Sequence, residues 1–146
     1  MIALIQRVSE AQVRVGQEVV GAIGRGVLAL IGVRRGDGDA AVERLLERLL
    51  SYRLFPDAAG RMNLCLREVG GGLLLVPQFT LAADTKKGTR AGFSTAAAPE
   101  EARRLFTQLV ERAQVVYAPV SAGVFAAHMQ VSLVNDGPVT FWLETP

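Results

Sequence analysis

The early part of the chain has the hydrophobic pattern of β-strands. Apolar and polar residues alternate over residues 11–16, which is the period of a half-buried strand. Gly16-Gln17 is typical of a tight turn and predicts a hairpin with a second strand over residues 18–23. The nearly unbroken apolar run over residues 27–33 predicts a strand that is covered on both faces.

Two later segments repeat apolar side chains at the 3.6-residue period of an α-helix. The first has Asp39 as its expected N-cap, and Pro56 prevents its continuation. The second begins at Pro99, with Glu100 and Glu101 at the positive end of the helix dipole. Both segments predict helices that pack one apolar face on a sheet.

Shorter apolar runs predict further strands over residues 73–80, 115–120, 129–134 and 139–144, with a turn at 135–138 between the last two. Residues 81–98 show no periodicity, and a long loop of this kind in a compact domain is usually functional or disordered. We therefore expect an α/β protein with a single domain over residues 1–146. It would be mostly β-sheet or partial barrel, with two packed helices.

Composition narrows the class of protein. Half of the 146 residues are apolar and 21% are charged, which excludes an intrinsically disordered chain. No apolar stretch approaches the ~18 residues of a membrane helix, and Arg7 and Glu10 interrupt any signal peptide. One cysteine, Cys65, excludes an internal disulfide framework and is expected to be a small buried hydrophobe. We expect a soluble, cytoplasmic protein without membrane partners.

The net charge of +2 permits an anionic partner without requiring one. Lys86, Lys87 and Arg90 lie in a glycine-containing stretch where Asp84 is the one nearby acid. This stretch is interpreted either as a solvated basic loop or as a phosphate-binding segment.

Familiar catalytic patterns are absent from the sequence. The single histidine, His128, rules out a histidine-rich metal site, and it is interpreted as a hydrogen-bonded structural residue. No phosphate-binding loop or dinucleotide fingerprint occurs. Two segments remain, residues 77–80 and 135–140, which taken alone are an ordinary strand end and an ordinary hairpin.

Together with the rest of the chain, these segments resemble the D-aminoacyl-tRNA deacylase family of the bacterial and eukaryotic type. The resemblance covers the first strand at residues 3–8, the motif Leu-Val-Pro-Gln-Phe-Thr-Leu at 75–81, and the loop with Lys87, Gly88, Arg90 and Phe93. It also covers twelve contiguous residues, from Met129 to Thr140.

The resemblance implies a homodimeric enzyme that hydrolyses the ester between a D-amino acid and the 3′ end of tRNA. It also implies removal of glycine mischarged on alanine tRNA, with no metal or organic cofactor. The implied catalytic residues are Gln78, Phe79 and Thr80. Chirality selection falls to Met129 and to Gly137 and Pro138, which are joined by a cis bond and inserted into the other subunit. Lys86, Lys87 and Arg90 would bind tRNA, and no DNA partner is expected.

Elementary chemistry is compatible with these roles. An aminoacyl ester is already activated, so an oxyanion hole and an oriented water can suffice without a protein nucleophile. Amides at the strand end, those of Phe79 and Thr80, suit such a hole, and the adjacent ribose hydroxyl can help to activate water. A rigid backbone wall excludes an L side chain better than a mobile side chain does.

Three departures from the family pattern are visible. Pro77 replaces the usual serine, so that hydroxyl and one backbone donor are missing. Ala91-Gly92 occupies a position where the family often has Pro-Ser, and His128 occupies one where the family commonly has an acidic residue. Pro77 favours one alternative, a non-catalytic tRNA-binding domain, whereas the Gly137-Pro138 dipeptide speaks against it. Another alternative, a hydrolase of small esters or free D-amino acids, is weakened by the basic loop.

Overall fold

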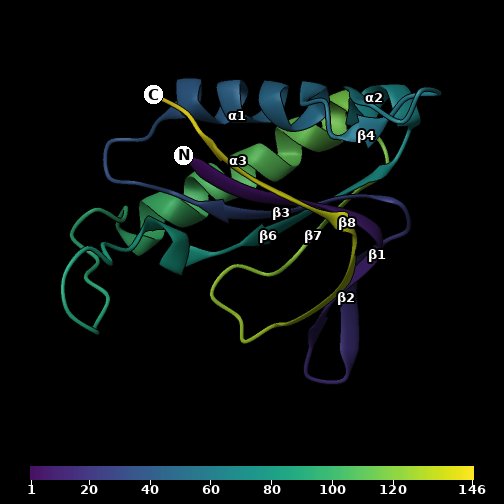
Figure 1. The fold of residues 1–146 in the computed structure, drawn as a ribbon. Helices are drawn as coiled ribbons and strands as arrows, with labels where there is room; N and C mark the ends of the chain where they lie inside the picture. Colours follow the sequence, from purple (N-terminus) through teal and green to yellow (C-terminus); the bar gives the residue numbers. More distant parts are fainter.

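One long strand organises the sheet of this protein, which is described over residues 1–146 by a computed structural model (Figure 1). Strand β1 (Ile2–Val15) pairs antiparallel with β3 (Gly26–Gly32) along its first half and with β2 (Glu18–Ile23) along its second. Along its other edge runs β8 (Gln130–Glu144), also antiparallel. The predicted hairpin is confirmed, and Gly16 at its turn has the positive φ, 58°, that favours glycine.

The sheet continues from β3 through two parallel neighbours, β6 (Gly72–Pro77) and β7 (Val120–Ala122). Its order is β2-β1-β3-β6-β7, with β8 beside β1. The first and last strands of this order meet, because the Ser121 hydroxyl of β7 donates to the Ala22 carbonyl of β2 over 3.2 Å. The predicted fold class, mostly β-sheet in the form of a partial barrel, is therefore confirmed.

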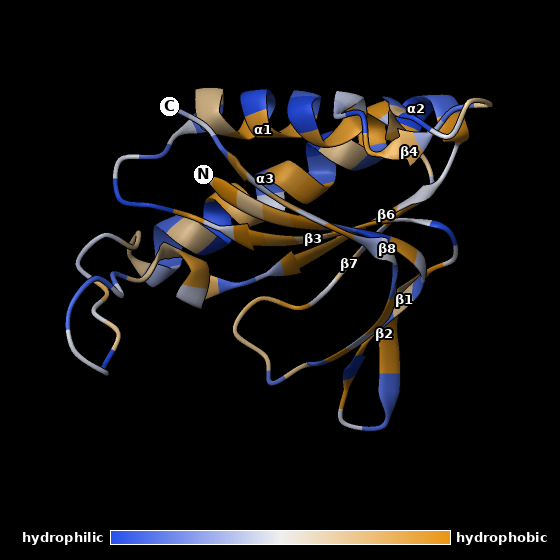
Figure 2. Cartoon of the chain, in the orientation of Figure 1, coloured by the Kyte–Doolittle hydropathy of each residue, from blue (hydrophilic) through white to orange (hydrophobic).

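Helices α1 (Asp39–Ser51) and α3 (Pro99–Val116) lie on one face of the sheet (Figure 1). Each turns its apolar stripe towards the strands and its charged side chains outwards. Figure 2 shows the alternation of hydrophobic and hydrophilic residues along α1. Between helices and sheet lies the main core, which includes Leu45, Leu49, Leu73, Leu105 and Leu109. A smaller core on the opposite face includes Val8, Val13, Leu28, Leu74 and Val76.

The helical regions differ from expectation in two details. The N-cap of α1 is Gly38, and Asp39 is the first helical residue, where it forms an ion pair with Arg104 at 3.1 Å. A third, short helix, α2 (Leu66–Val69), follows the small pair of strands β4 (Phe55–Pro56) and β5 (Met62–Leu64). Four residues are too few to show a helical period, so the pattern did not reveal α2.

Two predicted strands have the wrong bounds. Helix α3 continues to Val116, so the strand expected over residues 115–120 begins only at Val120. The strand expected over residues 73–80 ends at Pro77, and a 3-10 helix, η1 (Phe79–Ala82), follows it. This last change determines the geometry of the candidate site.

The predicted turn at residues 135–138 is not a chain reversal. Residues on both sides of it pair with β1, Asn135 with Val8 and Thr140 with Gln6, so β8 continues in one direction. The intervening residues form a bulge, because they are more numerous than the β1 residues that they oppose.

Cys65 is buried, as predicted. None of the helices has the length and apolar character needed to cross a lipid bilayer.

Candidate functional site

A cavity of about 480 Å³ opens where β6 ends and η1 begins. We call it the ester pocket. It brings together four of the residues that the sequence singled out, Gln78, Phe79, Thr80 and Met129. Its other lining residues are Val76, Pro77, Pro99, Phe125, Ala126, Ala127, His128 and Val131.

The backbone at the pocket changes direction just after the buried strand. The Gln78 amide still donates to the Ile31 carbonyl of β3 over 2.7 Å, and the Gln78 carbonyl then accepts from Leu81 at 3.2 Å. The amides of Phe79 and Thr80 lie at the first turn of η1 and have no acceptor in the chain. The strand end thus supplies two consecutive unpaired backbone donors, the type of group that forms an oxyanion hole.

The Thr80 hydroxyl is held by its neighbour. Gln78 Nε2 donates to Thr80 Oγ1 over 2.6 Å, and no histidine, lysine or carboxylate contacts this oxygen. A threonine without an adjacent base is a weak nucleophile, so this geometry suits a positioning role for Thr80.

Proline fits at position 77 because its missing donor is not needed there. Backbone groups of successive residues in β6 point alternately towards β7 and towards β3. The Leu75 carbonyl faces the side of β7 and accepts from the Gly123 amide at 2.8 Å, whereas the Gln78 amide faces β3. An amide at position 77 would face the side of β7, whose pairing with β6 ends at Ala122.

The facing wall of the pocket is the loop over residues 123–129, which the sequence analysis did not assign to a site apart from Met129. The Val124 amide donates to Met129 Sδ at 3.4 Å, and the Arg103 guanidinium lies 4.8 Å from the centre of the Phe125 ring. Ala126 has a positive φ of 65°, a conformation that alanine rarely adopts. The loop is rich in alanine and lacks any motif, so no pattern pointed to it.

His128 belongs to this wall. It is exposed, lines the pocket and makes no hydrogen bond within the chain. Its interpretation as a hydrogen-bonded structural residue is therefore wrong.

The Gly137-Pro138 dipeptide lies elsewhere in the same chain, on the bulge of β8. The bond between the two residues is cis, as the resemblance implied, and both residues are exposed. Arg7 supports the bulge, since its Nε donates to the Asp136 carbonyl over 2.9 Å and its Nη1 to the Leu54 carbonyl over 2.8 Å.

The pairing register separates this dipeptide from the ester pocket of its own chain. The bulge lies beside Arg7, which is aligned with Val27 of β3 and, through it, with Leu73 of β6. From Leu73 to Gln78 the strand advances roughly 16 Å. The structure therefore does not bring Gly137 and Pro138 to Gln78, Phe79 and Thr80 within one chain.

The basic loop is folded onto itself beside the pocket. Asp84 and Gly92 exchange backbone hydrogen bonds of 2.8 and 2.9 Å, and the Asp84 carboxylate accepts from the Lys86 amide at 3.0 Å. The side chains of Lys86, Lys87 and Arg90 are exposed and take part in none of the ion pairs. Lys86 also lines a groove of about 590 Å³ that includes Thr80.

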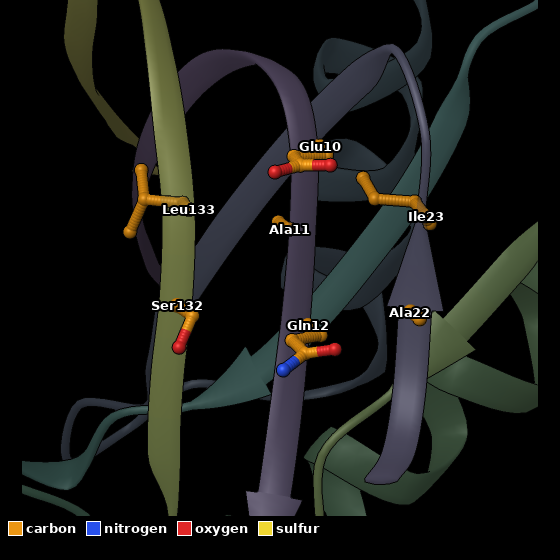
Figure 3. A pocket seen from close by; sticks show the side chains of 7 residues that line it. All are labelled: Glu10, Ala11, Gln12, Ala22, Ile23, Ser132 and Leu133. Carbon is orange, nitrogen blue, oxygen red and sulfur yellow. The ribbon is translucent and has the colours of Figure 1, made fainter.

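A second hollow of about 390 Å³ lies over β1 where β2 and β8 flank it, and it is bordered by Glu10, Gln12 and Ser132 (Figure 3). None of the predicted site residues lines it, and the exposed backbone amides of η1 are not part of it. The ester pocket is therefore the better candidate for chemistry.

Titratable groups with a shifted pKa lie outside the ester pocket. Hydrogen bonds lower the pKa of three carboxyl groups. The main donor is the Asn63 side chain for Asp57 and the Cys65 amide for Glu68. For Glu101, the main donor is the Arg104 side chain. No group of three or more His, Cys, Asp or Glu side chains has the arrangement to hold a metal ion. The chemistry that the pocket offers is thus that of backbone donors, one glutamine carboxamide, one threonine hydroxyl and one exposed imidazole.

Comparison with known proteins identifies the class of protein that has this fold and site. Residues 4–144 match the D-Tyr-tRNA(Tyr) deacylase family, so almost the whole chain is covered. The chain belongs to this family. Membership confirms the resemblance seen in the sequence and the predicted enzyme class, a hydrolase of an ester bond.

Individual relatives are similar over their full length. The chain is 69% identical to a D-aminoacyl-tRNA deacylase of Thioalkalivibrio sulfidiphilus, covering 100% of this chain and 98% of the relative. It is 61% identical to a D-aminoacyl-tRNA deacylase of Vibrio cholerae, with 99% of each chain covered.

Two solved structures share the fold. The structure of a c-Myc DNA unwinding element binding protein has a TM-score of 0.95 and 36% identity, with 100% of this chain and 99% of that chain covered. A probable eukaryotic D-amino acid tRNA deacylase has a TM-score of 0.78 and 18% identity, with 99% and 98% covered, and so supports the fold.

Proposed function

We propose that residues 1–146 act as one domain that hydrolyses the ester of D-aminoacyl-tRNA and releases the free D-amino acid and tRNA. The observation that carries this proposal is the pair of unpaired amides, Phe79 and Thr80, at a pocket lined by Gln78 and Met129. Glycine mischarged on alanine tRNA is a second substrate by the same logic, because it has no side chain for a chiral wall to exclude.

The proposed reaction needs no covalent intermediate. Water attacks the ester carbonyl, the developing oxyanion accepts hydrogen bonds from the two amides, and the 3′ oxygen of the terminal ribose leaves. The 2′-hydroxyl of that ribose relays a proton from the attacking water to the leaving 3′ oxygen, which compensates for the lack of a base beside Thr80. Gln78 contributes by holding the Thr80 hydroxyl at 2.6 Å.

Chirality selection is proposed to come from a second subunit. Gly137 and Pro138 are exposed on the β8 bulge and lie far from their own pocket, so they are available to enter the pocket of a partner, opposite Met129. The backbone there rejects an L side chain because it cannot rotate away.

Features of β8 support a homodimer. This strand pairs only with β1, so its other edge has free backbone donors and acceptors. Val134 and Trp142 on the same strand are 50% and 48% exposed, which is unusual for large apolar side chains and favours burial against a partner.

The first test compares the protein hydroxyl with the RNA hydroxyl. We expect Thr80→Ala and Thr80→Ser to keep substantial deacylation of D-tyrosyl-tRNA, because Thr80 is not a nucleophile in this reaction. Loss of the terminal 2′-hydroxyl is expected to slow wild-type deacylation by about 100-fold or more. The opposite ranking would restore Thr80 as the nucleophile, and L-tyrosyl-tRNA serves as the control substrate.

A second test concerns His128, the one imidazole at the pocket. It lacks a partner that would orient it, so we expect His128→Gln to change kcat by less than about threefold, whereas loss of a general base costs ~100-fold or more. A large loss, accompanied by loss of the acidic limb of the pH profile, would identify His128 as the base.

The alternative function is a nucleic-acid-binding domain without catalysis. The lack of the family's serine hydroxyl at Pro77 favours it, and so does the name of the structural neighbour at 36% identity, which refers to DNA binding by that protein. The same deacylation assay distinguishes the two functions. A non-catalytic domain would bind tRNA but would hydrolyse neither D-tyrosyl-tRNA nor L-tyrosyl-tRNA.

A further inference from the structure

Two phenylalanines form an exposed stack on the outer side of the ester pocket. The rings of Phe79 and Phe93 are 4.7 Å apart between centroids and inclined by 25°. The two side chains are 43% and 44% exposed, although each is large and apolar. Such a pair is not needed for the core, and exposed aromatic surface of this kind is typical of binding surfaces.

The stack lies in a groove of about 560 Å³, which we call the Phe79–Phe93 groove. It shares Phe79 and Pro99 with the ester pocket, so the two hollows adjoin. Its other lining residues are Arg35, Gly36, Ala96, Ala97, Ala98 and Glu101.

The positive charge in this groove is not neutralised within the chain. Arg35 is exposed and takes part in none of the ion pairs. The acid in the groove, Glu101, is occupied by Arg104, whose Nη2 lies 2.6 Å from its carboxylate, and this hydrogen bond lowers the Glu101 pKa. Phe93 itself lies on the loop that carries Lys86, Lys87 and Arg90.

Backbone hydrogen bonds fix the two sides of the groove to one another. The Arg35 amide donates to the Thr95 carbonyl over 2.9 Å, and the Ala97 amide donates to the Val33 carbonyl over 3.1 Å. The backbone segment that carries Arg35 is therefore held beside the segment that follows Phe93 before any ligand binds.

We propose that the Phe79–Phe93 groove binds the single-stranded nucleotides that precede the terminal adenosine of the RNA, with a base on the phenylalanine stack and a phosphate at Arg35. Aromatic side chains beside basic residues are the means by which proteins bind single-stranded nucleic acid. The proposal rests on the proposed function, because the ester pocket then holds the terminal adenosine and the strand leaves through the adjoining hollow.

The test uses two esters of different length, D-tyrosyl-adenosine and the D-tyrosyl ester of the trinucleotide CpCpA. The readout is the ratio of kcat/KM for the longer ester to that for the shorter one. We expect Phe93→Ala to lower this ratio by about 5- to 100-fold, because a stacked base is lost, and Phe93→Trp to restore it. Arg35→Ala lowers the ratio as well.

Control variants are available on the surface away from the groove. Val115 is 76% exposed at the far end of α3, and Arg61 is exposed before β5, so Val115→Ala and Arg61→Ala should leave the ratio unchanged. Unchanged ratios in both Phe93→Ala and Arg35→Ala would overturn the proposal.

Two further outcomes are separated by independent measurements. If Phe93→Ala converts a wild-type dimer into a monomer in sedimentation without RNA, the groove is a protein interface and the proposal fails. If wild type hydrolyses neither these esters nor D-tyrosyl-tRNA, the proposed function fails. In that case, fluorescence anisotropy of labelled, uncharged CpCpA measures binding to the groove without any reaction. We expect Phe93→Ala to bind CpCpA more weakly than wild type, and equal binding would overturn the proposal.

Discussion

Gly137 occupies a backbone position that has no room for a side chain. Its φ of 143° is rare for residues with a side chain. A Cβ atom there would lie 2.6 Å from Val139 Cγ2, 2.9 Å from Val139 N and 3.2 Å from Arg7 Nη2. The bulge and its support by Arg7 therefore require glycine at this position.

We predict that Gly137→Ala lowers the free energy of unfolding by about 1–3 kcal/mol and also lowers deacylation of D-tyrosyl-tRNA. Urea denaturation and a deacylation assay measure the two effects. Gly60→Ala is the matched control, because Gly60 also has a positive φ, 81°, but has open space around it and lies outside the site. If Gly137→Ala reduced activity no more than Gly60→Ala, the bulge would have no role in the reaction.

At the scale of the elements, strong local patterns gave correct predictions and ambiguous ones did not. The apolar stripe of α3 and the buried run of β6 admit one interpretation each, and both elements are present, although β6 ends earlier and α3 extends further than the sequence predicts. Asn, Asp, Gly and Pro at residues 135–138 are equally suited to a hairpin and to a bulge. Which of the two forms depends on β1, a partner that lies far away in the sequence.

The candidate site was predictable only in part for the same reason. Gln78, Phe79 and Thr80 could be singled out as a polar strand end with a family motif, and the structure places them together. The facing loop is distant from these residues in the sequence and reaches them only in the folded chain. Its alanines have no functional groups that would mark them as site residues. Exposed surfaces such as the Phe79–Phe93 stack also depend on contacts between separate segments.

The short helix α2 has a cap that makes a prediction about acid stability. Its Glu68 carboxylate accepts from the Cys65 amide over 3.0 Å, and this hydrogen bond lowers the pKa of Glu68 below its usual value of 4.5. The unfolded chain therefore takes up the proton first as the pH falls. The stabilising contribution is present above about pH 4.5 and is lost as the pH falls through the lower, folded-state pKa.

We predict that Glu68→Gln lowers the free energy of unfolding at about pH 6 and reduces the loss that wild type shows between pH 6 and pH 3. Urea denaturation at both pH values measures this. Glu18→Gln, which removes an exposed carboxylate without a hydrogen-bond partner, is the control. An equal effect of both substitutions would show that general charge, and not the cap, is responsible.

The basic loop leads to a prediction about RNA affinity. Lys86 and Lys87 are exposed and unpaired beside the pocket, and we propose that they and Arg90 contact phosphates near the 3′ end of tRNA. Replacing both lysines by alanine should weaken binding and reduce the slope of log K against log salt by about one to two units. Filter binding of uncharged tRNA at several salt concentrations measures the slope. An unchanged slope would identify the segment as a solvated loop.

At the scale of the whole molecule, the separation between the β8 bulge and the ester pocket is the reason for the homodimer that we propose. Sedimentation at micromolar concentration should show a dimer, and a monomer that still deacylates D-aminoacyl-tRNA would contradict the shared site. The two-fold interface that we propose would give two equivalent sites, each with the pocket of one subunit and the dipeptide of the other. This arrangement can be tested by combining two defective subunits.

One defective subunit is Ala127→Trp, which fills the ester pocket, and the other is Gly137→Ala, which damages the dipeptide. In a mixed dimer, both defects fall in one site, and the other site is intact. Co-expression with different tags should therefore restore about a quarter of wild-type activity, since random pairing makes half of the dimers mixed and each has one good site. Tandem purification confirms that mixed dimers form. If purified mixed dimers had no activity above that of the parent variants, each site would be built within a single chain.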